Sequence, residues 1–459
     1  MTNRALLIAI AASGLVSAPA AAKQGPLAQA VGAPDNLVIT ATVRARVEGI
    51  DGQFRPNIAT GDSMLSLRTA IAAEYDAGPV RFGAEMWDAR AYGQAINSSA
   101  GTGEVNALEL VQAYVRAELG DWSKGAKGGK GLLTAGRFTM DIGSRRLVAR
   151  NRFRNTTNSF TGANLDWTTG DGKRLQAFYT LPQIRLPDDA QGIRDNRVKW
   201  DSESTALQFY GADVTIPKVL GGTVEAYAFG LAERDTPTRL TRNRRIGTVG
   251  ARLYAKPQAG KWDHDTEAAY QFGKVRRSTG AADLADVDVS AWFAHGEVGY
   301  TFEKGWHPRA AVLMDGVSGD GGKPGKYGRF DTLFGSRRFD FGPTALYGAL
   351  SRANIVSPGL RLELTPSKRT DGGITYRALW LEDSRDSFSN TGVKDATGKS
   401  GRFAGHQIDA RVRTWIVPDL LQAETGAAFL FKHGVLRNAP NAPATGNTAY
   451  GYLDLTLSL

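Results

Sequence analysis

The densest group of chemically active side chains in this sequence lies between Gly136 and Phe160. The stretch holds six arginines against a single acidic residue, Asp141. Arginine presents a planar fork of donors that fits carboxylates and phosphates through paired hydrogen bonds. If the stretch lies inside a pore, its arginines form a basic constriction of the kind that selects anions. In the alternative interpretation, it is an exposed loop that contacts lipopolysaccharide phosphates.

Further arginines fall on the polar faces of segments in which polar and apolar residues alternate. We expect most arginines with an acidic neighbour to form structural cross-strand pairs, which contribute some tenths of a kcal/mol to roughly 1 kcal/mol each. Arginines without such a partner would select the solute. The candidate substrate-binding and selectivity residues are Arg137, Arg145, Arg146, Arg150, Arg152, Arg154, Arg44, Arg46, Arg68, Arg116, Arg411 and Arg413.

The alternation itself predicts the strands that position these side chains. At the end of the chain, Leu453, Leu455, Leu457 and Leu459 share one face of an extended segment, and Asp454 lies on the other. Leu37–Val47 alternates in the same way. A period of two with one apolar and one polar face is typical of a membrane β-barrel strand, which is apolar toward lipid and polar toward the lumen.

About 18 such segments follow one another along the chain, and the gaps between them alternate between short and long. Asp76–Pro79 and Pro418–Asp419 are turn-like, whereas the intervening gaps are mostly long and rich in Gly, Ser, Asn and Arg. Gly120–Lys130 is long for a turn, and we assign Gly342–Asn354 to an outer loop. The sequence therefore predicts an all-β fold: a transmembrane antiparallel β-barrel of about 18 strands, with short periplasmic turns, long extracellular loops and both termini on the periplasmic side.

The N-terminus has the features of an export signal. Arg4 precedes a short apolar stretch, and Ala20–Ala22 supplies a small-residue cleavage site before Lys23. We expect residues 1–22 to be a signal peptide and residues 23–459 to form the barrel in the bacterial outer membrane. Tryptophans near predicted strand ends would form interfacial belts, namely Trp87, Trp167, Trp262, Trp306, Trp380 and Trp415.

Composition points to an anionic partner rather than to an enzyme. The 459 residues include 56 Lys and Arg against 46 Asp and Glu, a formal net charge of +10. An exported basic chain suits an acidic polysaccharide, lipopolysaccharide phosphate or an acidic solute, and we expect no nucleic acid. None of the five histidines lies in a serine-hydrolase signature. His264 lies between Asp263 and Asp265, which could suggest a metal site, but adjacent residues of a strand point to opposite faces. We therefore expect no catalytic residue, metal or cofactor.

Three motifs resemble the alginate export family of outer-membrane barrels. Gly136–Gly162 matches a strand ending in Gly-Arg, an Ile/Leu-x-Gly-x-x-Arg-Leu-Val element, an Arg-Asn pair and a Phe-x-Gly. Gly328–Phe334, followed by the strand Pro358–Pro366, is similar to the family's Phe-Asp-x-Leu-Phe loop and return strand. Gly405–Asp409 resembles its Gly-x-Glu-Leu-Asp strand start, with Gln407 in place of the common acid. The chain ends in Leu459, where these barrels commonly end in Phe.

The resemblance implies a monomeric barrel of 18 strands with an electropositive lumen constricted by loops. With the arginines above, it favours a porin-like channel for an alginate-like anionic polysaccharide or sugar-acid oligomer. The family also includes many members with other substrates. The alternative is a non-transporting barrel that acts as an adhesin or envelope scaffold and binds lipopolysaccharide. A barrel hydrolase is a third, weaker interpretation. Expected partners are an anionic saccharide and the lipid and lipopolysaccharide of the outer membrane.

Overall fold

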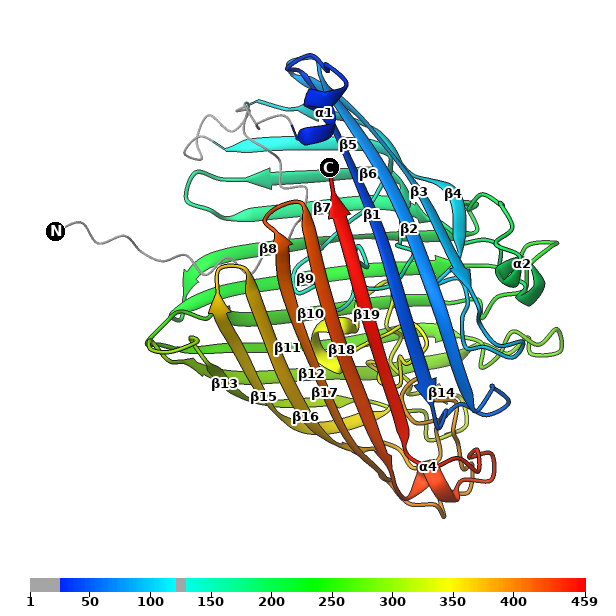
Figure 1. The fold of residues 1–459 in the computed structure, drawn as a ribbon. Helices are drawn as coiled ribbons and strands as arrows, with labels where there is room; N and C mark the ends of the chain where they lie inside the picture. The colour runs from blue at the N-terminus through cyan, green and yellow to red at the C-terminus, as the bar shows by residue number, and fades with distance from the viewer. Residues whose placement is uncertain (1–24, 121–128) are drawn as a thin grey trace.

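The structure, a computed structural model, describes residues 25–120 and 129–459. One large sheet of antiparallel neighbours dominates the fold (Figure 1). Its strands are β1 (Leu37–Asp51), β2 (Gly61–Asp76), β3 (Val80–Tyr92), β4 (Asn106–Glu118), β5 (Lys130–Phe138), β6 (Phe160–Thr168), β7 (Arg174–Pro182), β8 (Leu207–Val219), β9 (Gly222–Glu233), β10 (Arg245–Ala255), β11 (Trp262–Val275), β12 (Val287–Thr301), β13 (Arg309–Val317), β14 (Lys326–Tyr327), β15 (Ile355–Ser367), β16 (Thr370–Trp380), β17 (Phe403–Val417), β18 (Leu421–Lys432) and β19 (Thr448–Ser458).

The sheet closes on itself because its first and last strands pair. β1 runs antiparallel to β19, with Arg46 opposite Asp454 and Ala45 opposite Leu455. β14 has only two residues and pairs in parallel with β12, so it is an addition to the ring and not a member of it. The ring therefore has 18 strands, and the predicted antiparallel barrel is confirmed.

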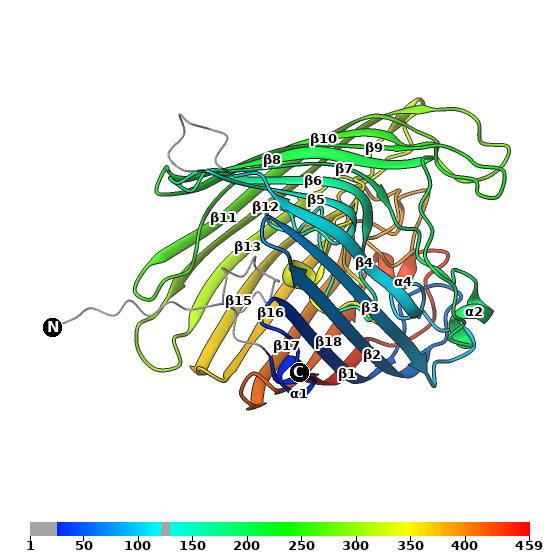
Figure 2. The same cartoon turned by 90° about the horizontal axis from the view of Figure 1, so that it is seen from above.

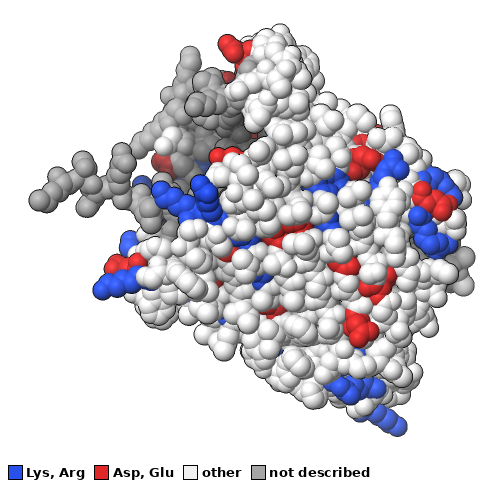
Figure 3. All heavy atoms as spheres, in the orientation of Figure 1, with Lys and Arg blue, Asp and Glu red and all other residues white. Residues whose placement is uncertain are grey.

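The alternation predicted from the sequence divides each strand between an outer and an inner face. In β1, Val43 and Val47 are 42% and 58% exposed, whereas Arg44 and Arg46 are 3% and 2% exposed. Apolar residues thus face outward and charged residues face inward, as a barrel in lipid requires. The face of the molecule in Figure 3 is mostly white, so Lys, Arg, Asp and Glu cover only a small part of it.

Short turns and long loops lie at opposite ends of the barrel. The turn between β2 and β3 spans residues 77–79, and the turn between β15 and β16 spans residues 368–369. At the other end the connections are longer, for example residues 139–159 between β5 and β6 and residues 318–354 between β13 and β15. The C-terminus lies at the short-turn end, beside Gly25. The predicted signal peptide and part of the β4–β5 connection lie outside the described residues.

In the described residues, four short helices accompany the barrel, and one of them lies inside it. They are α1 (Pro26–Ala30), α2 (Ala190–Arg194), α3 (Arg338–Phe341) and α4 (Val435–Asn438). In both Figure 1 and Figure 2, strands surround α3. Residues 342–354, which follow α3, form no strand, as predicted, but Leu346 and Tyr347 are fully buried in the same hydrophobic core as inward-facing strand residues.

No helix within residues 25–120 and 129–459 is both long enough and apolar enough to cross a membrane.

One predicted position in the aromatic belt is wrong. Trp87 is buried on the inner face of β3, where its indole N–H donates to Glu85 at 2.7 Å. Trp262 and Trp306 are exposed toward the short-turn end, as expected for an interfacial residue.

Candidate functional site

The arginine-rich loop between β5 and β6, residues 139–159, folds into the barrel. Arg44 on the inner face of β1 donates to the carbonyl oxygen of Arg152 at 2.8 Å. Arg46 donates to the carbonyl oxygen of Phe153 at 2.6 Å. The Asn155 amide donates to the carbonyl oxygen of Leu67 in β2 at 3.0 Å. Inward-facing side chains of β1 and backbone groups of β2 thus hold the loop against one wall.

The same loop reaches the opposite wall through Arg146. Its guanidinium donates to Glu267 at 2.7 Å and to Asp265 at 3.0 Å, both on β11. It also binds Asp340 of α3 at 3.0 Å. One arginine therefore joins two lumenal loops and the barrel wall. Because its charge is matched by three carboxylates, Arg146 serves as a structural anchor and has little capacity left for a passing anion.

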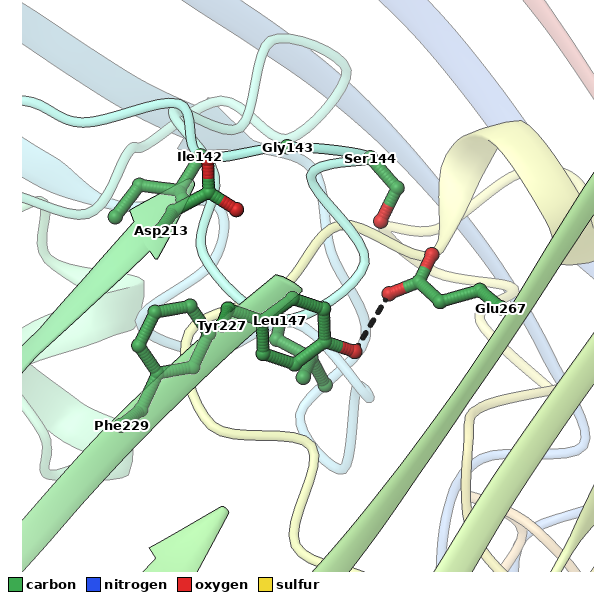
Figure 4. Close-up of a pocket in the computed structure, with 8 residues that line it drawn as sticks. All are labelled: Ile142, Gly143, Ser144, Leu147, Asp213, Tyr227, Phe229 and Glu267. Carbon is green, nitrogen blue, oxygen red and sulfur yellow. Dashed lines mark hydrogen bonds between the residues drawn. The ribbon is translucent and has the colours of Figure 1, made fainter. Parts of the chain in front are cut away.

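The loop packs closely against this wall and leaves only a small cavity between them. Figure 4 shows Ile142, Gly143, Ser144 and Leu147 facing Asp213, Tyr227, Phe229 and Glu267, with a hydrogen bond of 2.8 Å from the Tyr227 hydroxyl to Glu267. The cavity that they enclose has a volume of about 10 Å³. That is close to the space of one water molecule, so the cavity has no room for a larger molecule.

Asp340 fixes α3 across the lumen. Its carboxylate binds Arg146 and the fully buried Arg352, and its backbone carbonyl accepts from Arg377 of β16 at 3.0 Å. Burial alone would raise the pKa of the Asp340 carboxyl. The adjacent Arg146 and Arg352 outweigh burial and hold that pKa well below its usual range. Asp340 therefore stays ionised at neutral pH and keeps both arginines in place.

Nine of the twelve predicted selectivity residues have a carboxylate within 4 Å. Besides Arg146, they are Arg137 with Glu109, Arg150 with Glu85, Arg152 with Asp141, Arg44 and Arg46 with Asp454, Arg116 with Glu74, Arg411 with Asp371 and Glu424, and Arg413 with Asp371. The expectation that many such arginines form structural pairs agrees with this geometry. Their role in selectivity stays a prediction.

The other three predicted residues form no ion pair with any residue that the structure describes. Arg68 lies over the ring of Trp87, at 4.5 Å, and faces backbone carbonyl groups of the loop. Arg145 lies over the ring of Phe339, at 4.1 Å. Arg154 donates to the side-chain oxygen of Asn158 at 3.2 Å. Among the twelve predicted residues, these three are therefore the ones without an acidic partner in the described part of the chain.

Sequence reasoning missed three loop arginines, Arg55, Arg185 and Arg337, which act together with the predicted Arg154. We name these four residues, whose charges all interact with that of Glu104, the loop arginine cluster. Arg185 and Arg154 share the side-chain oxygen of Asn158, at 2.6 and 3.2 Å. Arg55 donates to the carbonyl oxygen of Tyr347 at 2.6 Å. The members come from four different loops, so no local motif in the sequence brings them together.

The electrostatics of the loop arginine cluster favour an added negative charge. Burial, and then the neighbouring charge of Arg337, lower the pKa of Arg55 to about 10. Burial and the charges of Arg185 and Arg337 lower the pKa of Arg154 well below its ordinary value. Four buried guanidinium groups thus interact with the charge of one carboxylate, that of Glu104. A bound anion would relieve the repulsion among them.

Carboxylates and histidines do not form a metal site in the part of the chain described. No group of three or more His, Asp or Glu side chains there has an arrangement that could hold a metal ion.

A closed barrel with apolar residues outside, charged residues inside and long loops folded into its lumen defines an outer-membrane β-barrel. The alginate export family matches residues 35–449. The chain belongs to the alginate export family, as its motifs predicted. No curated protein sequence matches it.

Solved structures of outer-membrane channels share this fold. OccK8 (OprE) of Pseudomonas aeruginosa is 13% identical with a TM-score of 0.57, covering 93% of this chain and 98% of that one. OccAB1 of Acinetobacter baumannii is 12% identical with a TM-score of 0.57, covering 92% and 96%. OpdK of P. aeruginosa, in a structure with vanillate, is 14% identical with a TM-score of 0.54, covering 92% and 98%. At these identities the likeness establishes the fold and not the substrate.

Proposed function

We propose that this barrel is a channel that passes anionic saccharides, as alginate-like polysaccharide or sugar-acid oligomers, across the outer membrane. The observation that supports the proposal is the set of hydrogen bonds that ties residues 139–159 to the inner face of β1 and to β2. With the loop folded inward, Arg145, Arg152 and Arg154 would line the path of the solute. Charged groups that line a constriction are a recurrent means of ion selection.

Unequal pairing of the arginines divides their proposed roles. Arg146 and Arg150 are tied to carboxylates at 2.7 and 2.6 Å and would hold the loop in place. Arg68, Arg145 and Arg154, together with the loop arginine cluster, would supply the attraction. Because their charges are spread along the lumen, an anion would meet several moderate sites rather than one deep trap, which permits passage.

The comparisons support this proposal at the level of class. The family is described as alginate export, and OpdK, which shares the fold, has been crystallised with vanillate, a small organic anion. We propose that this chain likewise takes an anion with a carboxylate, that it works as a monomer with its long loops outside the cell, and that it is not an enzyme.

Single-channel recording in planar bilayers tests the proposal. The purified barrel should form pores, and a polyuronate added on one side should reduce the current in a concentration-dependent way. A neutral polysaccharide of similar length is the control. A barrel that forms no pores but binds lipopolysaccharide would support the adhesin or scaffold alternative, which the dense ion pairing of the lumenal loops also fits.

A further inference from the structure

Phe339 is unusual among the aromatic side chains of the lumenal loops because nearly half of it is exposed. It belongs to α3, where its neighbours Asp340 and Phe341 are buried at 4% and 1% exposure, whereas Phe339 is 46% exposed. The helix is held inside the barrel by Arg377 and by the Gln407 amide, which donates to the carbonyl oxygen of Phe341 at 3.2 Å. An apolar ring is therefore presented to the aqueous lumen and not to lipid.

Arg145 is held over this ring by its backbone. Its N–H donates to the carbonyl oxygen of Ile142 at 2.9 Å, and its carbonyl oxygen accepts from the N–H of Ser336 at 2.9 Å. Its φ is +65°, in the left-handed region that side-chain-bearing residues seldom adopt. Such strain persists only where the surroundings enforce it, and it is concentrated at functional positions.

The guanidinium group of Arg145 keeps its donors available. It lies 4.1 Å from the centre of the Phe339 ring and has no hydrogen bond or ion pair to any residue within 25–120 or 129–459. The adjacent Arg146 is bound by three carboxylates. The two consecutive arginines therefore differ. Arg146 is paired with carboxylates, whereas Arg145 has no ion pair to a described residue and lies beside a half-exposed ring.

A second arginine–phenylalanine contact nearby shows what a purely structural stack looks like. The Phe153 ring has Arg46 at 3.9 Å and Arg338 at 4.5 Å, with Tyr452 edge-on at 5.1 Å. Those two arginines are paired with Asp454 and Glu424. Phe339 contacts one arginine, has no second ring against it among the described residues, and is 46% exposed. A further flat group therefore has room to stack on this ring.

Resting on the proposed channel function, we propose that Phe339 and Arg145 form a binding subsite for a carboxylate carried on a six-membered ring. The ring of the solute would stack on the exposed part of Phe339, and its carboxylate would accept hydrogen bonds from Arg145. The same chemistry is offered by a uronic acid, whose pyranose ring has an apolar face, and by an aromatic acid. An acyclic carboxylate satisfies only the arginine.

Single-channel recordings with three sodium salts test this subsite. Benzoate and glucuronate represent the two ring sources, and acetate carries the same charge without a ring. Aromatic contacts are worth enough to lengthen the dwell time of a ring carboxylate about 2- to 10-fold over acetate. A long dwell with benzoate alone would identify an aromatic source, and with glucuronate alone a saccharide source.

Variants assign the effect to the two residues. Phe339→Leu should shorten the ring-acid dwell to that of acetate, whereas Phe339→Tyr should retain it. Arg145→Gln should shorten the dwell for all three anions. Phe82→Ala, at a 49% exposed phenylalanine on the outer face of β3, and Arg369→Gln, at the short-turn end, are the matched controls.

Equal dwell times for ring and acyclic carboxylates would overturn the subsite, as would a ring preference that survives in Phe339→Leu. The channel proposal would still hold in both cases if the pore prefers anions. A pore that prefers cations, or no pore at all, would instead refute the proposed function.

Discussion

Replacing Asp340 with Asn should loosen the loops that cross the lumen while leaving the barrel folded. Asp340 is buried and binds Arg146, at 3.0 Å, and Arg352. Among the residues that the structure describes, only Asp340 links α3 to the arginine-rich loop through a carboxylate. The strands do not depend on it, because their ladder hydrogen bonds form between backbone groups.

The size of the effect follows from what each arginine retains. Removing one side of a buried ion pair costs about 3–5 kcal/mol, because the remaining charge stays buried. Arg146 keeps Glu267 and Asp265, and Arg352 keeps the carbonyl oxygen of Ser336 at 2.7 Å. We therefore expect a cost at the lower end, about 3 kcal/mol, which corresponds to roughly a 100-fold rise in the population of opened loops.

Single-channel recording measures that population directly. Asp340→Asn should show frequent steps to a higher conductance, with the heat-modifiable mobility of the folded barrel unchanged. Asp371→Asn is the matched control, since Asp371 also binds two arginines, Arg411 and Arg413, but both lie on the barrel wall. An Asp340→Asn channel with wild-type conductance and no such steps would show that Asp340 does not hold the constriction.

Three further outcomes follow from the same geometry. Replacing Arg68, Arg145 and Arg154 by Ser in one triple variant should reduce anion selectivity. The loss of stability should be small, because none of the three has an ion pair to a described residue. Unchanged reversal potentials would place these arginines outside the ion path. Burial raises the pKa of Glu104, so the carboxylate inside the loop arginine cluster becomes neutral as the pH falls through that raised pKa. Anion selectivity should therefore rise in acid. Glu104→Gln should remove this component of the pH dependence. Arg46→Ala should lower the free energy of unfolding by about 3 kcal/mol, the lower end of the range for a buried pair, because Asp454 of β19 keeps, among the described residues, only Arg44 as an ion-pair partner, at 3.7 Å. Urea titration in micelles measures this change, and an unchanged midpoint would show that the seam does not rely on the Arg46–Asp454 pair.

The fold could be predicted because its signal is local. Alternation along β1 and β19 states which residues meet lipid, and it needs no knowledge of distant contacts. The phase of short and long gaps gave the strand number, and it excluded a strand in residues 342–354. Trp87 was misplaced because a tryptophan near a strand end fits both the interfacial belt and a buried inner-face position, and only its neighbours distinguish the two.

The candidate site could be predicted only in part, because its partners are distant in the sequence. Gly136–Phe160 is recognisable from composition, but Arg146 meets Glu267 121 positions later. The sequence therefore cannot tell which arginines are neutralised and which stay open. The loop arginine cluster has the same origin, since single arginines from four loops meet only after the barrel has closed.

In the proposed channel, the arginines that lack an acidic partner make the pore prefer anions. The reversal potential of the purified wild-type barrel in a potassium chloride gradient tests it most directly. If the pore prefers anions, the potential should have the sign that chloride permeation gives and should grow as ionic strength is lowered, because screening weakens. A potential of the opposite sign, showing preference for potassium, would contradict it.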